Sequence, residues 1–249
     1  MKDSQDKMKI INRDMMKYIA IIPMAIGHFI AYMEEYGLLT EITWWMTLLT
    51  SLSLLAPPIF FFFVAEGFRY TRSRKQYALR LLLFAAVTQI PFCVVNHGTL
   101  FTVSFFTLWN IIATLFLGLI ALIVWESKLK MPVKIIIIVL LDAVTVLLSF
   151  EWMIFGIPII LGFHIFYDKP KARLIWFTAL TLIFAFISSG FSLYVLFYEN
   201  VFFMMISYFL ITKCYNGKKG SHPVFAKWFF YIFYPLHLFL IYFTKLLIS

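Results

Sequence analysis

The sequence is short of charged residues and of cysteine. Of its 249 residues only 13% are charged, whereas a soluble domain carries about 25%. This shortage excludes a water-soluble globular enzyme, because no soluble core could bury the 63% of residues that are hydrophobic. It equally excludes a disordered or fibrous chain. The two cysteines exclude a disulfide scaffold and a cysteine-based zinc cluster.

Long apolar stretches fill most of the chain. A spanning helix needs roughly 20 mostly apolar residues to cross about 30 Å of hydrocarbon. The sequence therefore predicts an all-α, polytopic transmembrane helical bundle of about nine spans (8–10), forming a single integral membrane domain over residues 1–249. The expected spans are Met15–Tyr32, Trp44–Ala65, Tyr77–Val95, Val103–Trp125, Val133–Phe150, Trp152–Tyr167, Leu174–Ser189, Leu193–Thr212 and Trp228–Ile248.

The basic residues predict the orientation of these spans. With the N-terminus in the cytoplasm, every Lys and Arg except Lys245 falls in the N-terminal tail or in an inner loop, as the positive-inside rule requires. The net charge of +9 is then an asymmetry at a membrane surface, and no nucleic-acid partner is expected. The tail and the first inner loop carry Lys2, Lys7, Lys9, Arg13, Lys17, Arg69, Arg72, Arg74, Lys75 and Arg80.

Four polar residues, His28, Asn110, Asp142 and His237, fall inside the expected spans. At about 1.5 Å of rise per residue, His28 lies roughly 20 Å from the inner surface, and His237 and Asp142 lie roughly 14 Å from it. Asn110 enters from the outer side and reaches about the level of His28. Ionisable groups at this depth cost several kcal/mol, so the four residues predict a functional site. Hydrogen bonds that merely join helices, worth about 1 kcal/mol, remain the alternative for each.

Other polar residues are expected near the membrane surfaces. His164 is near an inner helix end, and His97 and His222 are in loops, so we expect all three to be solvated. No metal site is indicated, because the histidines are scattered. The arginines of the first inner loop anchor the inner face under the positive-inside rule. Their alternative role is a cytoplasmic anion site, because a guanidinium group binds phosphates in a bidentate geometry.

Several stretches resemble the TraX family of bacterial membrane proteins. They follow the family order over nearly the whole chain: Met16–Met24 with Gly27 and His28, Pro58–Phe92, Phe105–Leu108, Glu151 and Trp152 with Gly156, and Phe233–Leu238. TraX resembles in turn the acyltransferase-3 membrane enzymes. In those enzymes a basic residue and a histidine, with ten residues between them, mark the first helix, and Lys17 and His28 have that spacing.

The resemblance implies an integral membrane acyltransferase of the bacterial cytoplasmic membrane. The founding TraX activity acetylates the N-terminus of a pilin subunit, and the wider group moves acyl groups from cytoplasmic acyl-CoA to acceptors at or beyond the membrane. The expected donor is therefore acetyl-CoA, and the acceptor is a peptide N-terminus, a glycan or a lipid-linked sugar. The implied roles are base for His28, acceptor orientation or oxyanion stabilisation for His237 and Asn110, and binding of CoA phosphates for Lys17, Arg69, Arg72 and Arg80.

The sequence departs from the family pattern at two places. Gly27 stands where the family usually carries Asp directly before the histidine, and Leu54–Pro57 lacks the Arg that is favoured there. Asp142 replaces the missing acid only if its helix lies beside that of His28. The alternative function is a non-enzymatic permease, or an immunity or sensor protein for a peptide, because buried polar residues also line transport paths.

Overall fold

The computed structural model describes residues 8–100, 102–190 and 192–248, and within these ranges the chain is helical, with isolated bridges and no named strand. Six helical segments are long and apolar enough to cross a membrane, and two shorter apolar helices accompany them. The predicted all-α membrane architecture is therefore confirmed, whereas the number of spans and the side of the N-terminus stay predictions. Lys2 and Lys7 lie outside the described residues. The six segments are Arg13–Glu35, Trp44–Tyr70, Arg74–His97, Pro170–Ser188, Val195–Cys214 and Val224–Ile248.

The chain forms two compact units, and it passes from one to the other within α4 (Ala56–Tyr70), α10 (Pro170–Ser188) and α12 (Pro223–Ile248). Unit 1 holds the described residues up to Phe60 and those from Ile175 to Phe233. Unit 2 holds Phe61–Leu174 and Tyr234–Ile248.

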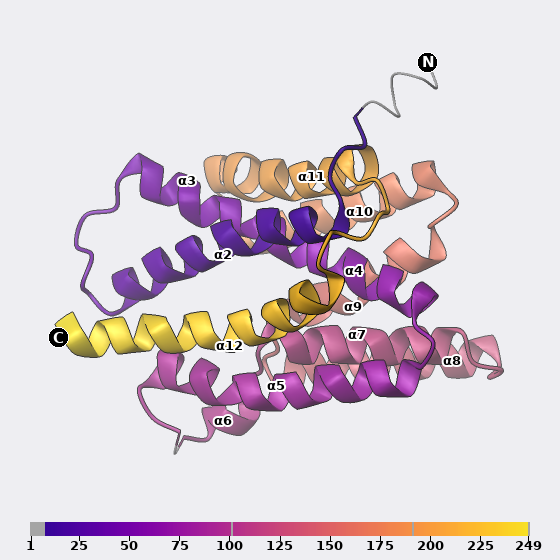
Figure 1. Cartoon of the computed structure of the whole chain (residues 1–249), viewed down its shortest axis with the longest axis horizontal. Helices are drawn as coiled ribbons and strands as arrows, with labels where there is room; N and C mark the ends of the chain where they lie inside the picture. The colour runs from indigo at the N-terminus through magenta and orange to yellow at the C-terminus, as the bar shows by residue number, and fades with distance from the viewer. Residues whose placement is uncertain (1–7, 101, 191, 249) are drawn as a thin grey trace. The chain divides into compact units, whose positions relative to one another are not determined.

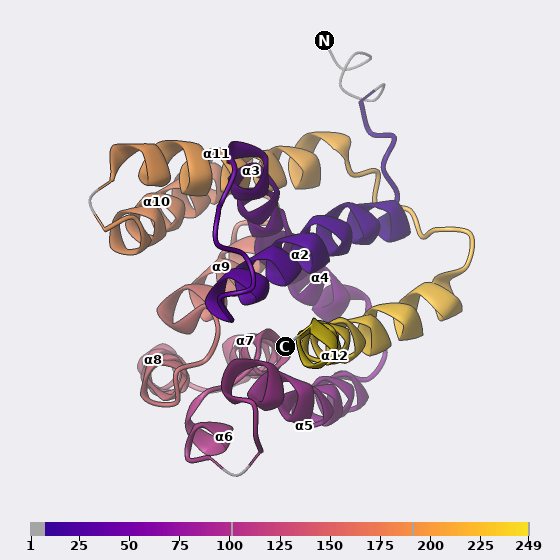
Figure 2. The same cartoon turned by 90° about the vertical axis from the view of Figure 1, so that its left-hand side faces the viewer.

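Unit 1 is built around the pairing of α2 with the segment that follows it in the chain. In Figures 1 and 2, α2 (Arg13–Glu35) lies beside α3 (Trp44–Leu52), and the 3₁₀ turn η1 (Ser53–Leu55) also packs on α2. Near the N-terminus, Ile11 exchanges backbone hydrogen bonds with Cys214 and Asn216. Unit 1 also contains most of α10 and the π-helical turns η2 (Val195–Val201) and η3 (Leu210–Cys214), with α11 (Phe202–Phe209) between them.

Unit 2 is centred on α7 (Ile111–Trp125), which packs against α5 (Arg74–His97), α8 (Met131–Leu147) and α9 (Met153–Ile165), as Figure 2 shows. The contact of α7 with α9 is close, because a Cβ atom on Gly156 would lie 2.3 Å from Cγ2 of Thr114. Glycine therefore lets the two backbones approach, as small residues do between membrane helices.

One expected span differs from the structure. Val103–Trp125 is not a single helix, because a short helix α6 (Ser104–Thr107) is followed by extended backbone and α7 begins only at Ile111. Asn110 is the N-cap of α7, and its Oδ1 accepts the backbone N–H of Ile112 at 3.1 Å. Asn favours this position because its side chain satisfies a backbone donor that a new helix leaves unpaired.

Candidate functional site

The residues predicted from the sequence divide between the two units. Lys17 and His28 lie in unit 1, whereas the other six lie in unit 2. The structure brings Asn110 and His237 into one polar cluster of unit 2, together with residues that the sequence did not single out as functional. The six residues of unit 2 are Arg69, Arg72, Arg80, Asn110, Asp142 and His237.

In unit 1, His28 lies half-buried on α2, with its ring 6.3 Å from that of Tyr32 in an edge-to-face arrangement. Beside it, a Cβ atom on Gly27 would come within 2.8 Å of Cβ of Ser53. The tight contact with η1 explains why the side chain of an aspartate does not fit at this position without a shift of the neighbouring segment. Lys17 places its Nζ 4.8 Å from the centre of the Phe230 ring.

The polar cluster of unit 2, hereafter the Glu151 cluster, consists of Gln89, Asn110, Glu151, Tyr234 and His237. Glu151 lies in the turn between α8 and α9, outside both helices. Its Oε2 accepts two hydrogen bonds, from the backbone N–H of Ile111 at 2.6 Å and from the Tyr234 hydroxyl at 2.9 Å. Burial raises the pKa of Glu151 to about 7, and these two hydrogen bonds only partly oppose the rise.

The turn that carries Glu151 is held firmly and is strained. The backbone N–H of Glu151 donates to the carbonyl of Trp109 at 2.9 Å, and Thr114 Oγ1 donates to the carbonyl of Glu151 at 2.5 Å. On either side, Ser149 and Trp152 have positive φ values of 41° and 65°. Such a conformation costs non-glycine residues on the order of 1–3 kcal/mol and persists only where the surrounding structure enforces it. The position of the Glu151 carboxyl group is therefore fixed by its neighbours.

Asn110 and Gln89 form the buried amide part of the cluster. Nδ2 of Asn110 donates to the carbonyl of Ala85 and to Oε1 of Gln89, both at 2.9 Å. Gln89 donates in turn to the carbonyls of Phe105 and Leu108 at 3.0 and 2.5 Å. Both side chains are almost completely buried. The amide network fixes the start of α7, and with it the N–H group that binds Glu151.

His237 and Asp142 occupy different surroundings. The buried His237 ring lies 5.1 Å from the ring of Tyr234 on the same helix, α12. Asp142 lies on α8, where its backbone carbonyl accepts the hydroxyl of Thr145 at 2.6 Å. Its Oδ1 is buried and has no hydrogen-bond partner within the described part of the chain. Within the described residues, Asp142 makes no hydrogen bond or ion pair with the Glu151 cluster.

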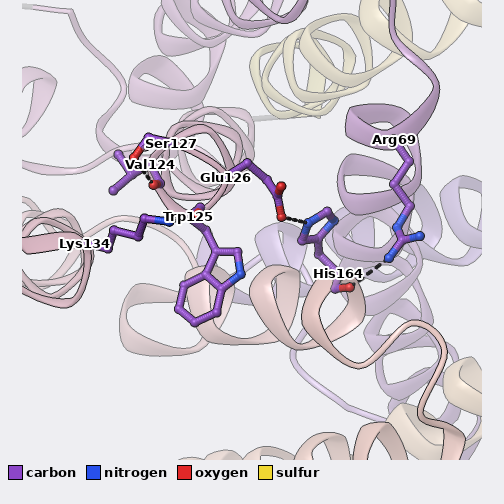
Figure 3. A network of polar contacts seen from close by, with 7 residues as sticks. All are labelled: Arg69, Val124, Trp125, Glu126, Ser127, Lys134 and His164. Carbon is purple, nitrogen blue, oxygen red and sulfur yellow. Dashed lines mark hydrogen bonds and ion pairs between the residues drawn. The ribbon is translucent and has the colours of Figure 1, made fainter. Parts of the chain in front are cut away.

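A second polar group, hereafter the His164 network, joins the C-terminal ends of α7 and α9 (Figure 3). His164 Nε2 lies 2.9 Å from Oε1 of Glu126, and a guanidinium nitrogen of Arg69 donates to the His164 carbonyl at 3.1 Å. The same guanidinium lies 3.8 Å above the Tyr167 ring. The hydrogen bond from His164 lowers the pKa of Glu126, more than its slight burial raises it. The expectation that His164 is solvated is wrong, because the Phe68 ring packs edge-on against the buried imidazole.

The basic residues of the first inner loop differ in the contacts that their side chains make with the rest of the protein. Arg69 is bound within the His164 network, whereas Arg72 is exposed. Arg74 lies 4.1 Å from the Phe68 ring, and Arg80 lies 5.7 Å from the Tyr77 ring. A cation–π contact uses the face of a guanidinium group and leaves the N–H groups on its edge able to bind an anion. The expected phosphate site therefore stays a prediction.

The sequence did not single out Glu151, Tyr234 or Gln89 as functional residues. All three occur in the stretches that resemble the TraX family, so a signal was present. For Glu151 this signal did not indicate chemistry, because the residue falls between the expected spans Val133–Phe150 and Trp152–Tyr167 rather than inside one of them.

Comparison with known proteins agrees with that resemblance. Residues 12–245 match the sequence model of the TraX protein family. The chain is also similar to a probable fimbrial assembly protein, FimC of serogroup H1, from Dichelobacter nodosus. The two are 28% identical over 252 residues, which cover 94% of this chain and 96% of that protein. No solved structure matches the chain.

Proposed function

Because the chain belongs to the TraX family, we propose that it is an acyltransferase of the bacterial cytoplasmic membrane. It transfers an acetyl group from cytoplasmic acetyl-CoA to an amine or hydroxyl of a peptide or glycan at the membrane or beyond it. The observation that supports this most is the Glu151 cluster, in which a carboxyl group, a phenol, an imidazole and two amides are held together in an apolar protein. Membrane proteins retain such groups where function needs them.

Thioester transfer needs a base for the nucleophile and hydrogen-bond donors for the oxyanion. In this proposal His28 is the base, and His237 orients the acceptor. Asn110 acts through its amide network, which fixes the start of α7. Asp142 remains a candidate because its buried Oδ1 lacks a hydrogen-bond partner in the described part of the chain.

The basic residues would bind the donor. Arg72 is exposed and offers its guanidinium to a phosphate, while Arg69 and Arg80 lie against aromatic rings. Lys17 lies near the start of α2 and completes the set that the family resemblance implies. An arginine beside an aromatic ring can bind a phosphate through its free edge, so these contacts are compatible with CoA binding.

The acceptor is proposed from the relative's name. That relative is described as a fimbrial assembly protein, so we propose that a fimbrial subunit, through its peptide N-terminus, is the acceptor here. Glycans and lipid-linked sugars are the acceptors to test if peptides fail.

The proposal is tested with the purified protein in lipid nanodiscs. Acetyl-CoA should raise the melting temperature in a saturable way, and CoA should be released slowly. His28→Ala should abolish CoA release, whereas His222→Ala, which changes a loop histidine, should leave it unchanged. A protein that responds neither to acetyl-CoA nor to longer acyl-CoAs would refute the enzyme and favour a permease or a peptide immunity protein.

A further inference from the structure

The proposed reaction puts negative charge on the carbonyl oxygen of the thioester, and a preorganised donor must stabilise it. The sequence suggested Asn110 for this role. In the structure both N–H groups of the Asn110 amide are already used, by Ala85 and Gln89. An amide with two satisfied donors has no strong donor left for a substrate, so another group is needed.

We propose that Glu151 is a catalytic residue of this site and that its protonated carboxyl group donates a hydrogen bond to the substrate carbonyl oxygen. This inference rests on the proposed function. Tyr234 is the positioning residue, because its hydroxyl holds Oε2 of Glu151.

The hydrogen bonds around Glu151 determine where its proton lies. Oε2 accepts both the Ile111 N–H and the Tyr234 hydroxyl, so the proton of the acid form belongs on Oε1. No hydrogen bond or ion pair within the described residues uses Oε1. The two hydrogen bonds on Oε2 hold the carboxyl group, and with it Oε1, in one orientation. The protein thus holds a carboxylic acid whose Oε2 accepts two hydrogen bonds and whose Oε1 has no hydrogen-bond partner in the described part of the chain.

The groups around Glu151 do not favour its charged form. Tyr234 and His237 are the titratable residues on the facing part of α12, and Asp142 is on α8. The ionisable groups of α7 and α9 lie at their far ends, where Glu126 follows α7 and His164 is in the last turn of α9. No Lys or Arg forms an ion pair with Glu151 in the described part of the chain. Burial without a cation therefore keeps the acid protonated to a higher pH than usual, in agreement with its pKa.

The step balances without a net change at Glu151. The general base of the proposed reaction takes the proton of the attacking N–H or O–H group, and the new bond forms at the acetyl carbonyl carbon. The carbonyl electron pair moves onto oxygen, where the Glu151 hydrogen bond stabilises it. It then returns as the C–S bond breaks. CoA leaves as a thiolate and takes up the proton held by that base.

The test compares CoA release across pH 5.5–9 in the wild type and three variants. Wild-type activity should fall as the pH rises through about 7, because Glu151 loses the donating proton. Glu151→Gln should stay within several-fold of the wild type at low pH and should lose this alkaline fall, because an amide donates at every pH. Glu151→Leu should lower kcat on the order of 10²–10³-fold, with melting temperatures measured in parallel. Glu126→Gln, at the other end of α7, should keep the wild-type profile.

The outcomes separate the two proposals. A wild type that releases no CoA overturns the proposed function and this inference with it. An active wild type with an unchanged alkaline fall in Glu151→Gln overturns the inference alone. So does a folded Glu151→Gln variant without activity, or a Glu151→Leu variant at the wild-type rate. If Glu151→Leu does not fold, the Glu151→Gln profile decides.

Discussion

A glutamate lies at each end of α7, Glu151 from the turn between α8 and α9 and Glu126 directly after the helix, and the pKa values of their carboxyl groups shift in opposite directions. Glu151 binds the first N–H of α7 and a phenol, both neutral donors, and burial raises its pKa to about 7. Glu126 follows the last residue of α7, has a side chain that is 42% exposed and pairs with His164, and its pKa is lowered. Whether a carboxyl group acts as an acid or as an anion is therefore set by its surroundings.

The backbone conformation also differs between the Glu151 cluster and the His164 network. The Glu151 turn contains two non-glycine residues, Ser149 and Trp152, with positive φ. The His164 network uses ordinary helix ends, where Lys134 and Ser127 donate to the last carbonyls of α7 (Figure 3). Strain at the first region and regular capping at the second favour the Glu151 cluster as the proposed site and the His164 network as a brace between helices.

The largest effect should come from removing the Glu151 side chain. Glu151→Ala leaves the Ile111 N–H and the Tyr234 hydroxyl without their acceptor, and unfolding free energy should fall on the order of 2–4 kcal/mol. Glu126→Ala removes a more exposed partner and should cost about 1 kcal/mol or less. Denaturant titration in nanodiscs measures both. Equal losses of unfolding free energy in Glu151→Ala and Glu126→Ala would contradict the distinction between the Glu151 cluster and the His164 network.

The pH dependence of stability should also have opposite signs at the two ends. The folded pKa of Glu151, about 7, lies above its ordinary value of 4.5, so its contribution is fully present below pH 4.5 and is lost as the pH rises through 7. The loss amounts to roughly 3 kcal/mol. The folded pKa of Glu126 is lowered, so its contribution is present above pH 4.5 and disappears as the pH falls. Melting curves from pH 4 to pH 9 should show the first trend vanish in Glu151→Gln and the second in Glu126→Gln.

Replacing His164 tests the brace alone. His164→Phe keeps a ring against Phe68 but removes the hydrogen bond to Glu126, so the unfolding free energy should fall by about 1–2 kcal/mol. The pH profile of CoA release should not change, because the Glu151 cluster is untouched. A shift of that profile would show that the two ends of α7 are coupled. Stability and CoA release are measured on the same nanodisc preparation.

The helices could be predicted because a membrane-spanning helix appears in the sequence as one continuous apolar stretch. Arg74–His97 lies within a few residues of the expected Tyr77–Val95 for this reason. The start of α7 could not be predicted in this way, because the apolar run continues through Val103–Trp125, whereas α6 ends at Thr107 and Asn110 caps α7. Local capping chemistry is weaker than hydrophobicity as a sequence signal.

The candidate site could be predicted only in part, because its chemistry is tertiary. Asn110 and His237 were expected from their polarity within apolar runs. Glu151 is buried and accepts a hydrogen bond from Tyr234, which is 83 residues away in the sequence, and a hydropathy profile cannot predict such a contact. His164 was misread for the same reason, because its burial depends on packing against Phe68 and Glu126 rather than on its place in the chain.

The smallest and most specific effect should come from Tyr234→Phe. The substitution removes one hydroxyl and keeps the ring, so we expect a loss of about 1 kcal/mol. The Tyr234 hydrogen bond lowers the pKa of Glu151, so without it that pKa should rise further and the alkaline fall in CoA release should move to higher pH. Tyr242→Phe is the matched control, because this hydroxyl on the same helix donates to the carbonyl of Gly98, at 3.1 Å, and not to Glu151. It should leave the profile in place. If both variants shift the profile equally, the hydroxyl of Tyr234 has no special role. A shift in Tyr234→Phe alone, at nearly unchanged stability, separates an effect on the Glu151 proton from an effect on folding.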